Sequence, residues 1–127
     1  MLTLTMLEAK HPLAKSFKFA FDGIKVAVER GRNFRIQICF AILAITLGFW
    51  LKIAQDEWID IFLIINLVLI LELINTSLES IVDLVSPEIH EKAKIAKDVA
   101  AAAVLISSFT SIAIGAVIFI PKILILL

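Results

Sequence analysis

Three long apolar runs constrain this sequence more than any other feature. They cover residues 36–53, 58–85 and 98–120. Each is long enough to cross a bilayer as a helix, which takes roughly 20 apolar residues. Pro121 follows the third run and is expected to end its helix there, because proline has no backbone N–H to donate. The runs therefore predict three membrane-spanning helices.

Composition supports the same conclusion. Hydrophobic residues make up 61% of the 127 positions and charged residues 19%, whereas soluble domains have about 45–50% apolar and about 25% charged residues. A chain this short has a high surface-to-volume ratio, so it would leave much of this apolar material exposed in water. We therefore predict an all-α membrane protein with a single domain over residues 1–127.

Residues 13–30, before the first run, have the pattern of an amphipathic helix. A helix of this kind lies along the membrane surface with its apolar side in the lipid. The alternative is that the apolar face packs only against the other helices. Apolar residues recur at helical spacing, between charged ones, at Phe17, Phe21, Ile24 and Val28.

The basic residues are placed unevenly along the chain. Seven precede the first run and three lie between the second and third, whereas the loop between the first and second has only Lys52. By the positive-inside rule, this places the N-terminus and the 86–97 loop in the cytoplasm. Basic and acidic residues balance at 12 each, so no nucleic-acid partner is indicated. The two cytoplasmic groups are Lys10, Lys15, Lys18, Lys25, Arg30, Arg32 and Arg35, then Lys92, Lys94 and Lys97.

Four polar side chains fall on one face of the second run. A carboxylate inside the hydrocarbon costs at least ~2.5 kcal/mol, so the first of them, Glu72, is a candidate functional residue. A contact between helices, a proton relay and the substrate site of a transporter are also compatible with a lone acid. The four lie three or four residues apart, the spacing that aligns side chains along a helix: Glu72, Asn75, Glu79 and Asp83.

These four residues are called the polar stripe below. The loop that follows them carries several charges, which favours phosphate chemistry. Mg²⁺ binds one or two carboxylates together with substrate phosphates, and lysine offers a point charge to phosphate oxygens. A second carboxylate at the membrane edge could take a proton from a lipid hydroxyl. Spacing alone leaves an enzyme, a transporter and a structural protein open.

Two motifs are more specific. The segments ELINTSLESIVD, residues 72–83, and AKIAKDVAAAAVL, residues 93–105, resemble the prokaryotic diacylglycerol kinase family of small membrane lipid kinases. The loop VSPEIH and the segments RNFRI and FIPK are more similar to its undecaprenol kinase branch than to the branch that phosphorylates diacylglycerol. The resemblance covers nearly the whole chain and includes the segment from His11 to Lys25 and the pair Glu57 and Trp58.

The resemblance implies a homotrimer with active sites shared between subunits, in the inner membrane of a bacterium. It implies transfer of phosphate from MgATP to a lipid alcohol on the cytoplasmic side, with undecaprenol favoured and diacylglycerol as the alternative. Glu72 matches the family's general base with Asn75 beside it, and Glu79 matches a carboxylate that binds Mg²⁺ and ATP. The remaining matches are Glu88, Ile89, His90, Lys97 and Asp98 at the nucleotide, and Asp83 as a supporting acid.

One position departs from the family pattern. The family usually has Glu, a second magnesium ligand, where this chain has Gly31. Glu29 lies two residues earlier, about 200° away around a helix. Either a helix break at Gly31 brings Glu29 to the metal, or Mg²⁺ relies on Glu79, phosphate oxygens and water.

The departure at Gly31 keeps a different class of function open, a non-catalytic membrane homologue with the same fold. A second departure, Gln37 in place of the family's usual His, is expected to matter less. Small residues in the third run are expected to permit close helix packing. They are the Ala run 100–103, Ser107, Ser108, Thr110, Ser111 and Gly115.

Overall fold

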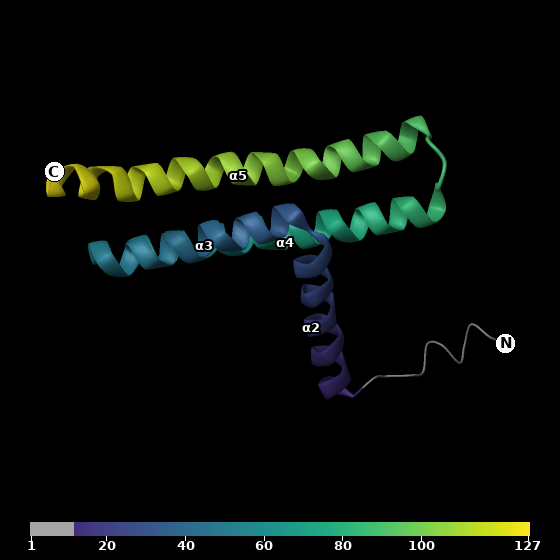
Figure 1. Cartoon of the computed structure of the whole chain (residues 1–127), viewed down its shortest axis with the longest axis horizontal. Coiled ribbons are helices and arrows are strands. Elements are labelled where there is room, and N and C mark those ends of the chain that lie inside the picture. The colour runs from purple at the N-terminus through teal and green to yellow at the C-terminus, as the bar shows by residue number, and fades with distance from the viewer. Residues whose placement is uncertain (1–11) are drawn as a thin grey trace.

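The computed structural model describes residues 12–127, which form four helices (Figure 1). These residues contain no strand, so the predicted all-α class is confirmed. Lys10 and His11, which entered the topology and the resemblance, lie outside the described residues. The helices are α2 (Leu13–Arg30), α3 (Arg32–Leu51), α4 (Gln55–Val85) and α5 (Glu91–Leu126).

Helix α2 begins and ends at the predicted residues and meets α3 at a corner. Gly31 ends the helix in an extended conformation, with φ −95° and ψ 98°, and its N–H donates to the Ala27 carbonyl at 2.8 Å. Arg35 fixes the corner from the α3 side by donating to the carbonyls of Val28 and Glu29. A Cβ at position 31 would lie 2.6 Å from the Ala27 carbonyl oxygen, so the close approach requires glycine.

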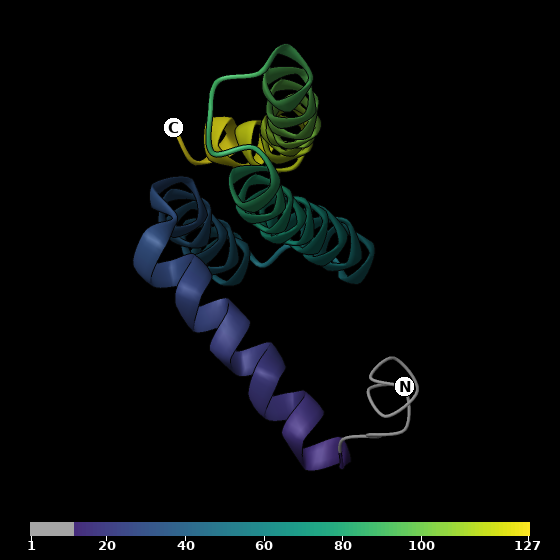
Figure 2. The same ribbon diagram turned by 90° about the vertical axis from the view of Figure 1, so that its right-hand side faces the viewer.

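The apolar face of α2 does not pack into the bundle of its own chain. Phe17, Phe21 and Ile24 are exposed, and Ala27 is the buried residue of this helix. Figures 1 and 2 show α2, in purple and dark blue, leaving the other helices at a steep angle. The arrangement favours a membrane surface over the alternative of packing against α3, α4 and α5.

Helices α3, α4 and α5 run side by side in alternating directions (Figure 1). All three are long and apolar enough to cross a membrane. Their lengths are 20, 31 and 36 residues, which corresponds to roughly 30, 46 and 54 Å. Because the hydrocarbon core is about 30 Å thick, α4 and α5 extend beyond it.

Helices α3 and α4 begin before the predicted spans 36–53 and 58–85, because helices continue through polar residues until a cap stops them. Helix α3 begins at Arg32, directly after the corner, and ends at Leu51, because Lys52 takes the left-handed conformation with φ 51°. Helix α4 begins at Gln55, where the Glu57 carboxylate accepts the Ala54 N–H at 3.0 Å.

The expected stop of the helix at Pro121 is wrong, and the helix begins before the predicted third span, 98–120. Helix α5 begins at Glu91 and continues through Pro121 to Leu126. Proline removes one N–H, so the carbonyl of Val117, four residues earlier, loses its usual helical donor. Membrane helices nevertheless tolerate proline, because local adjustments of the helix and neighbouring groups satisfy the freed backbone. Figure 2 shows the last turns, in yellow, leaving the line of α5.

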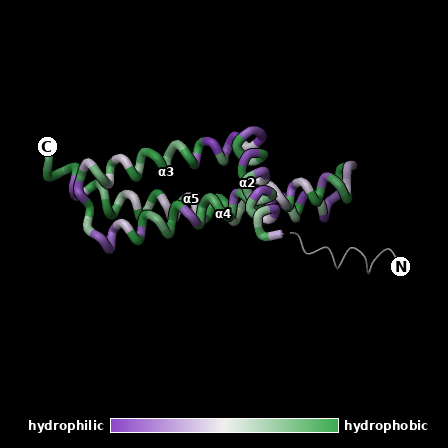
Figure 3. Tube along the Cα trace, turned by 90° about the horizontal axis from the view of Figure 1, so that it is seen from below, coloured by the Kyte–Doolittle hydropathy of each residue, from purple (hydrophilic) through white to green (hydrophobic). Residues whose placement is uncertain are grey.

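The buried apolar cluster of the chain lies at the end of the bundle that holds the α3–α4 loop. Elsewhere most large apolar side chains of α3, α4 and α5 are exposed, and Figure 3 shows these helices as mostly apolar along their length. Such surfaces require lipid or other protein around them. The cluster consists of Ile53, Ile61, Ile118 and Phe119.

Two further contacts close this end. Gly48 leaves room for the Trp58 ring, because a Cβ there would lie 2.6 Å from Trp58 Cη2. Lys122 donates to Glu57 Oε2 at 2.5 Å, and the two side chains are only 30% and 21% exposed. Helix α5 is therefore joined to α4 by an ion pair next to the apolar cluster.

Candidate active site

A groove of about 640 Å³ runs between α3, α4 and α5. Toward the α3–α4 loop its walls are apolar, with Leu47, Ile61 and Phe119. Toward the corner with α2 its walls become polar. The groove therefore joins an apolar channel to a polar end, and the side chains of that end are Asn33, Gln37, Glu72, Asn75 and Glu79.

The α5 wall of the groove is built from small residues. Ser108 and Ser111 donate their hydroxyls to carbonyls of their own helix, so they present little free polarity. A Cβ added at Gly115 would meet only Phe119, at 4.0 Å. These three residues, expected to permit close packing, line open space instead.

Three of the four residues of the predicted stripe line the groove: Glu72, Asn75 and Glu79. Glu72 and Asn75 are buried, at 4% and 7% exposure, whereas Glu79 and Asp83 are exposed. Asn75 Nδ2 donates to Glu79 Oε1 at 3.2 Å, which couples the buried and exposed parts of the stripe. The sequence spacing thus predicted a shared face correctly.

The depth of Glu72 follows from its neighbour on α3. Gln37 lies near Glu72 and five residues beyond Arg32, where α3 starts, which is roughly 8 Å along the helix. If α2 lies at the membrane surface, Glu72 is a short distance inside it. Glu79, two turns further along α4, is then at the surface.

Three buried oxygens at this end have no hydrogen-bond partner within residues 12–127. They are Gln37 Oε1, Glu72 Oε2 and Asn75 Oδ1. All three are acceptors, and buried acceptors are costly when no donor reaches them. This end of the groove is therefore suited to a group that brings a donor, such as a hydroxyl.

Gln37 is the residue of this group that the sequence spacing missed. The one signal was an amide inside an apolar run, where polar side chains are rare. Its proximity to Glu72 depends on how α3 packs against α4.

Lys97 contacts Asp83 across the α4–α5 hairpin and is also close enough to Glu79 for a charge interaction. Its neighbour Asp98 pairs with Lys94 at 2.5 Å instead. The predicted nucleotide residues Lys97 and Asp98 are thus adjacent in the chain but belong to two different ion pairs. Lys97 is the one that lies beside the polar stripe.

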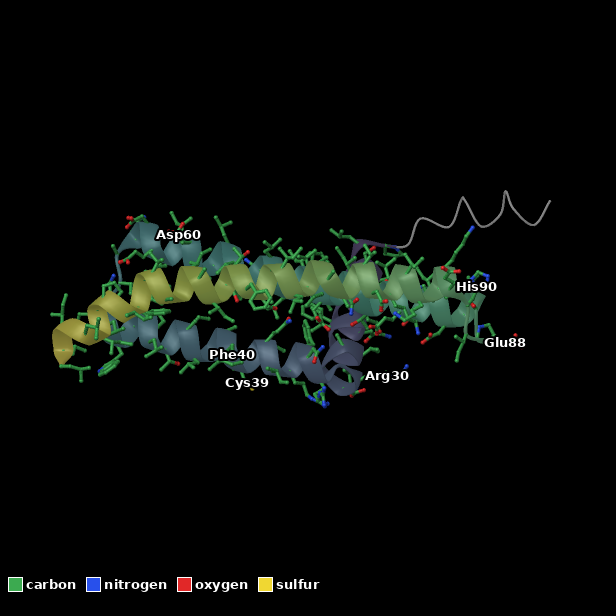
Figure 4. All side chains as sticks on the ribbon, turned by 90° about the horizontal axis from the view of Figure 1, so that it is seen from above. Arg30, Cys39, Phe40, Asp60, Glu88 and His90 are labelled. Carbon is green, nitrogen blue, oxygen red and sulfur yellow. The ribbon has the colours of Figure 1, made fainter. Side chains whose placement is uncertain are left out.

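The other predicted nucleotide residues are in the loop that joins α4 to α5. Glu88, Ile89 and His90 are exposed and are not part of the groove of their own chain. His90 caps α5, because its Nδ1 accepts the Lys92 N–H at 3.1 Å. Figure 4 shows Glu88 and His90 at the end of the hairpin, away from Arg30 where α2 meets the bundle.

Glu29 does not line the groove, although the helix does break at Gly31. Its side chain is exposed and lies 3.9 Å from Lys25. Within residues 12–127 no cluster of three or more His, Cys, Asp or Glu side chains forms a metal site. A metal held by this chain alone would therefore have few protein ligands, with Glu79 the acid placed beside the groove.

Comparison with known proteins identifies the family. The family model described as prokaryotic diacylglycerol kinase matches residues 18–119. An undecaprenol kinase of Bacillus subtilis is 41% identical over 85% of this chain and 88% of its own length. Diacylglycerol kinases of Synechocystis and Escherichia coli are 39% and 28% identical, over 91% and 79% of this chain and 73% and 82% of their own lengths. The chain therefore belongs to the prokaryotic diacylglycerol kinase family and is a membrane lipid kinase.

Proposed function

We propose that the chain transfers the γ-phosphoryl group of MgATP to the primary hydroxyl of undecaprenol. The observation that carries the proposal is the groove that ends at a buried carboxylate. An apolar channel suits the tail of a membrane alcohol, and its polar end offers Glu72 to the hydroxyl. The 41% identity with an undecaprenol kinase supports this acceptor.

In the proposed reaction, the hydroxyl oxygen of the lipid attacks the γ-phosphorus. A bond forms between these two atoms as the bond from the γ-phosphorus to the bridging oxygen of ADP breaks. Glu72, with Asn75 beside it, orients the hydroxyl and takes its proton. Positioning and charge neutralisation supply most of the catalysis in phosphoryl transfer, and the buried groove wall contributes the positioning.

Glu79 and Lys97 are proposed to hold the phosphates of MgATP. Mg²⁺ usually keeps several waters and binds one or two carboxylates together with substrate phosphates. A single exposed Glu79 beside the groove fits that preference, so Glu29 is not required as a ligand. Mg²⁺ would neutralise phosphate charge, and Lys97, near Glu79, would add a positive charge on the same side.

Glu88, Ile89, His90 and Asp98 are proposed to complete the nucleotide site, with Asp83 supporting Lys97. A homotrimer with shared sites is part of this proposal. It is supported by the exposed apolar surface of α3, α4 and α5, which other copies or lipid must cover. The uneven distribution of basic residues supports an inner-membrane protein with its active site on the cytoplasmic side.

A phosphotransfer assay in mixed micelles tests the proposal. The purified chain is supplied with MgATP and either undecaprenol or diacylglycerol, and the phosphorylated lipid is measured. Undecaprenol is expected to be the better acceptor. A higher kcat/KM for diacylglycerol would replace undecaprenol by the alternative, which the 39% identical Synechocystis kinase supports. Product from neither lipid would indicate the non-catalytic homologue.

The role of Glu72 is tested in the same assay with Glu72→Gln. Turnover is expected to fall by roughly 10²- to 10⁴-fold, the range for loss of a general base. Asp60→Asn is the matched control, because Asp60 is an exposed acid on the same helix and does not line the groove. Equal turnover in Glu72→Gln and the control would remove Glu72 from the mechanism.

A further inference from the structure

Two polar side chains interrupt the apolar run of α3, and they behave differently. Thr46 donates its hydroxyl to the Ile42 carbonyl at 2.8 Å, so its polarity is satisfied within its own helix. Gln37 instead lines the polar end of the groove, beside the Glu72 carboxyl of α4. Unlike Thr46, it therefore carries its amide to the end of the groove that holds the buried acid.

The amides around the stripe are oriented in the same sense. Asn75 donates its N–H to Glu79, and the Gln37 amide lies beside Glu72. Both amides keep their carbonyl oxygens buried and without a partner in the described chain. Each glutamate thus has a neutral amide next to it, while acceptor oxygens remain at the polar end of the groove.

One oxygen of Glu72 matters most in this arrangement. Glu72 Oε2 is buried and has no donor within residues 12–127, although Gln37 lies beside the same carboxyl group. An amide in this position can donate to one oxygen of the carboxylate and so restrict rotation about its last torsion. The other oxygen then keeps a fixed direction, which is what a proton acceptor needs.

We propose that Gln37 is a positioning residue that holds the Glu72 carboxylate so that its unbonded oxygen faces the lipid hydroxyl. The inference rests on the proposed function. A neutral amide suits the task, because it donates to the carboxylate without adding a charge to the buried end of the groove. Gln37 touches the base and not the transferred phosphate, so it acts through Glu72.

Two substitutions of Gln37 test this role in the micelle assay with undecaprenol and MgATP. Gln37→Leu removes the amide, and Gln37→Asn keeps an amide but shortens its reach by one methylene. Both are expected to lower kcat by ~10- to 100-fold, the cost of a misplaced reacting group. The KM for MgATP is expected to stay within about twofold, because Gln37 lies inside the membrane level of the groove. Thr46→Val is the matched control on the same helix.

A structural role would give a different result. Loss of a structural role would raise the KM for MgATP, or lower the yield of folded protein, together with kcat. If Gln37→Leu does not fold, the kinetics of Gln37→Asn provide the test. In the Glu72→Gln background, Gln37→Asn is expected to cause no further loss, because the group it positions is gone. Wild-type kcat in Gln37→Asn, or a fully additive loss, would overturn the proposal. A wild-type chain that phosphorylates no lipid would instead overturn the proposed function.

Discussion

The two ends of the α4–α5 pair are each joined by a lysine of α5 and an acid of α4, yet the two ends differ in their surroundings. At the α3–α4 loop end, Lys122 and Glu57 are partly buried beside the apolar cluster. At the opposite end, Lys97 and Asp83 are more exposed, with side chains 40% and 66% accessible. The first pair joins packed helices, whereas the second lies beside the polar end of the groove.

The difference also appears in the hydrogen bonding of buried groups. Around Glu57, one carboxylate oxygen accepts from Lys122 and the other from the Ala54 N–H. Around Glu72, an oxygen is buried without a donor in the described chain. The end at the α3–α4 loop satisfies its own polar groups and is expected to contribute to stability. The polar end of the groove leaves acceptors for a substrate and is expected to contribute to activity.

Among variants that compare the two ends, the largest expected effect is the loss of activity in Lys97→Met. Without this charge beside the phosphates, kcat/KM for MgATP should fall on the order of 100-fold, as when one electrostatic contact to a transition state is removed. The unfolding temperature should change little, because exposed ion pairs contribute at most about 1 kcal/mol. Lys94→Met, one turn earlier on α5, is the control. A loss of stability with unchanged kinetics would show that Lys97, like Lys122, contributes to stability and not to activity.

Gly48→Ala is expected to give the largest loss of stability. The new Cβ would meet the Trp58 ring at 2.6 Å, and overpacking of this kind costs about 1–3 kcal/mol. Thermal unfolding in detergent measures the effect. Gly115→Ala is the matched control, because its Cβ meets only Phe119 at 4.0 Å. Equal unfolding temperatures for the two variants would show that the closed end is not tightly packed.

Gly31→Ala and Gly23→Ala should have opposite effects on α2. At Gly31 the new Cβ clashes with the Ala27 carbonyl, whereas at Gly23 nothing lies within 4 Å. In Gly31→Ala the free energy of opening α2 should fall by about 1 kcal/mol, which raises the population of the open form about fivefold. In Gly23→Ala opening should become less favourable, because alanine favours helix more than glycine does. The rate of trypsin cleavage at Lys25 measures both. The same direction of change in both variants would contradict the requirement for glycine at the corner.

The smallest expected effect is that of Lys122→Met, at about 1 kcal/mol of unfolding free energy. The pair is partly buried, so its loss should lie between the values for exposed and buried pairs. Much of the cost is the unpaired Glu57, and the double variant Glu57→Gln with Lys122→Met should therefore recover part of it. The ratio of kcat to KM should remain that of the wild type. A loss of activity without a loss of stability would show that Lys122, like Lys97, serves activity.

Much of the fold could be predicted because the membrane limits the choices. The apolar runs located three helices, and the helical spacing of Phe17, Phe21, Ile24 and Val28 predicted α2 (Leu13–Arg30). The errors occurred where hydropathy and backbone geometry disagree. Residues 91–97 carry charges but are helical, and α5 continues through Pro121 to Leu126.

The site was predictable within one helix and less so between helices. Helical spacing placed Glu72, Asn75 and Glu79 on one face, and all three line the groove. The contacts of Gln37 with Glu72 and of Lys97 with Asp83 depend on how α3 and α5 pack against α4. No periodicity in the chain predicts such contacts, because they are set by side-chain packing between elements.

The groove is bordered by exposed apolar residues of α3 and α5, among them Phe40 and Leu105, and this has a consequence for kinetics. A lipid alcohol can enter sideways from the leaflet and need not leave the membrane. Its relevant concentration is then its mole fraction in the bilayer, and diluting it with other lipids slows the reaction even at constant total amount. In the proposed reaction the protein meets the lipid in two dimensions and ATP in three.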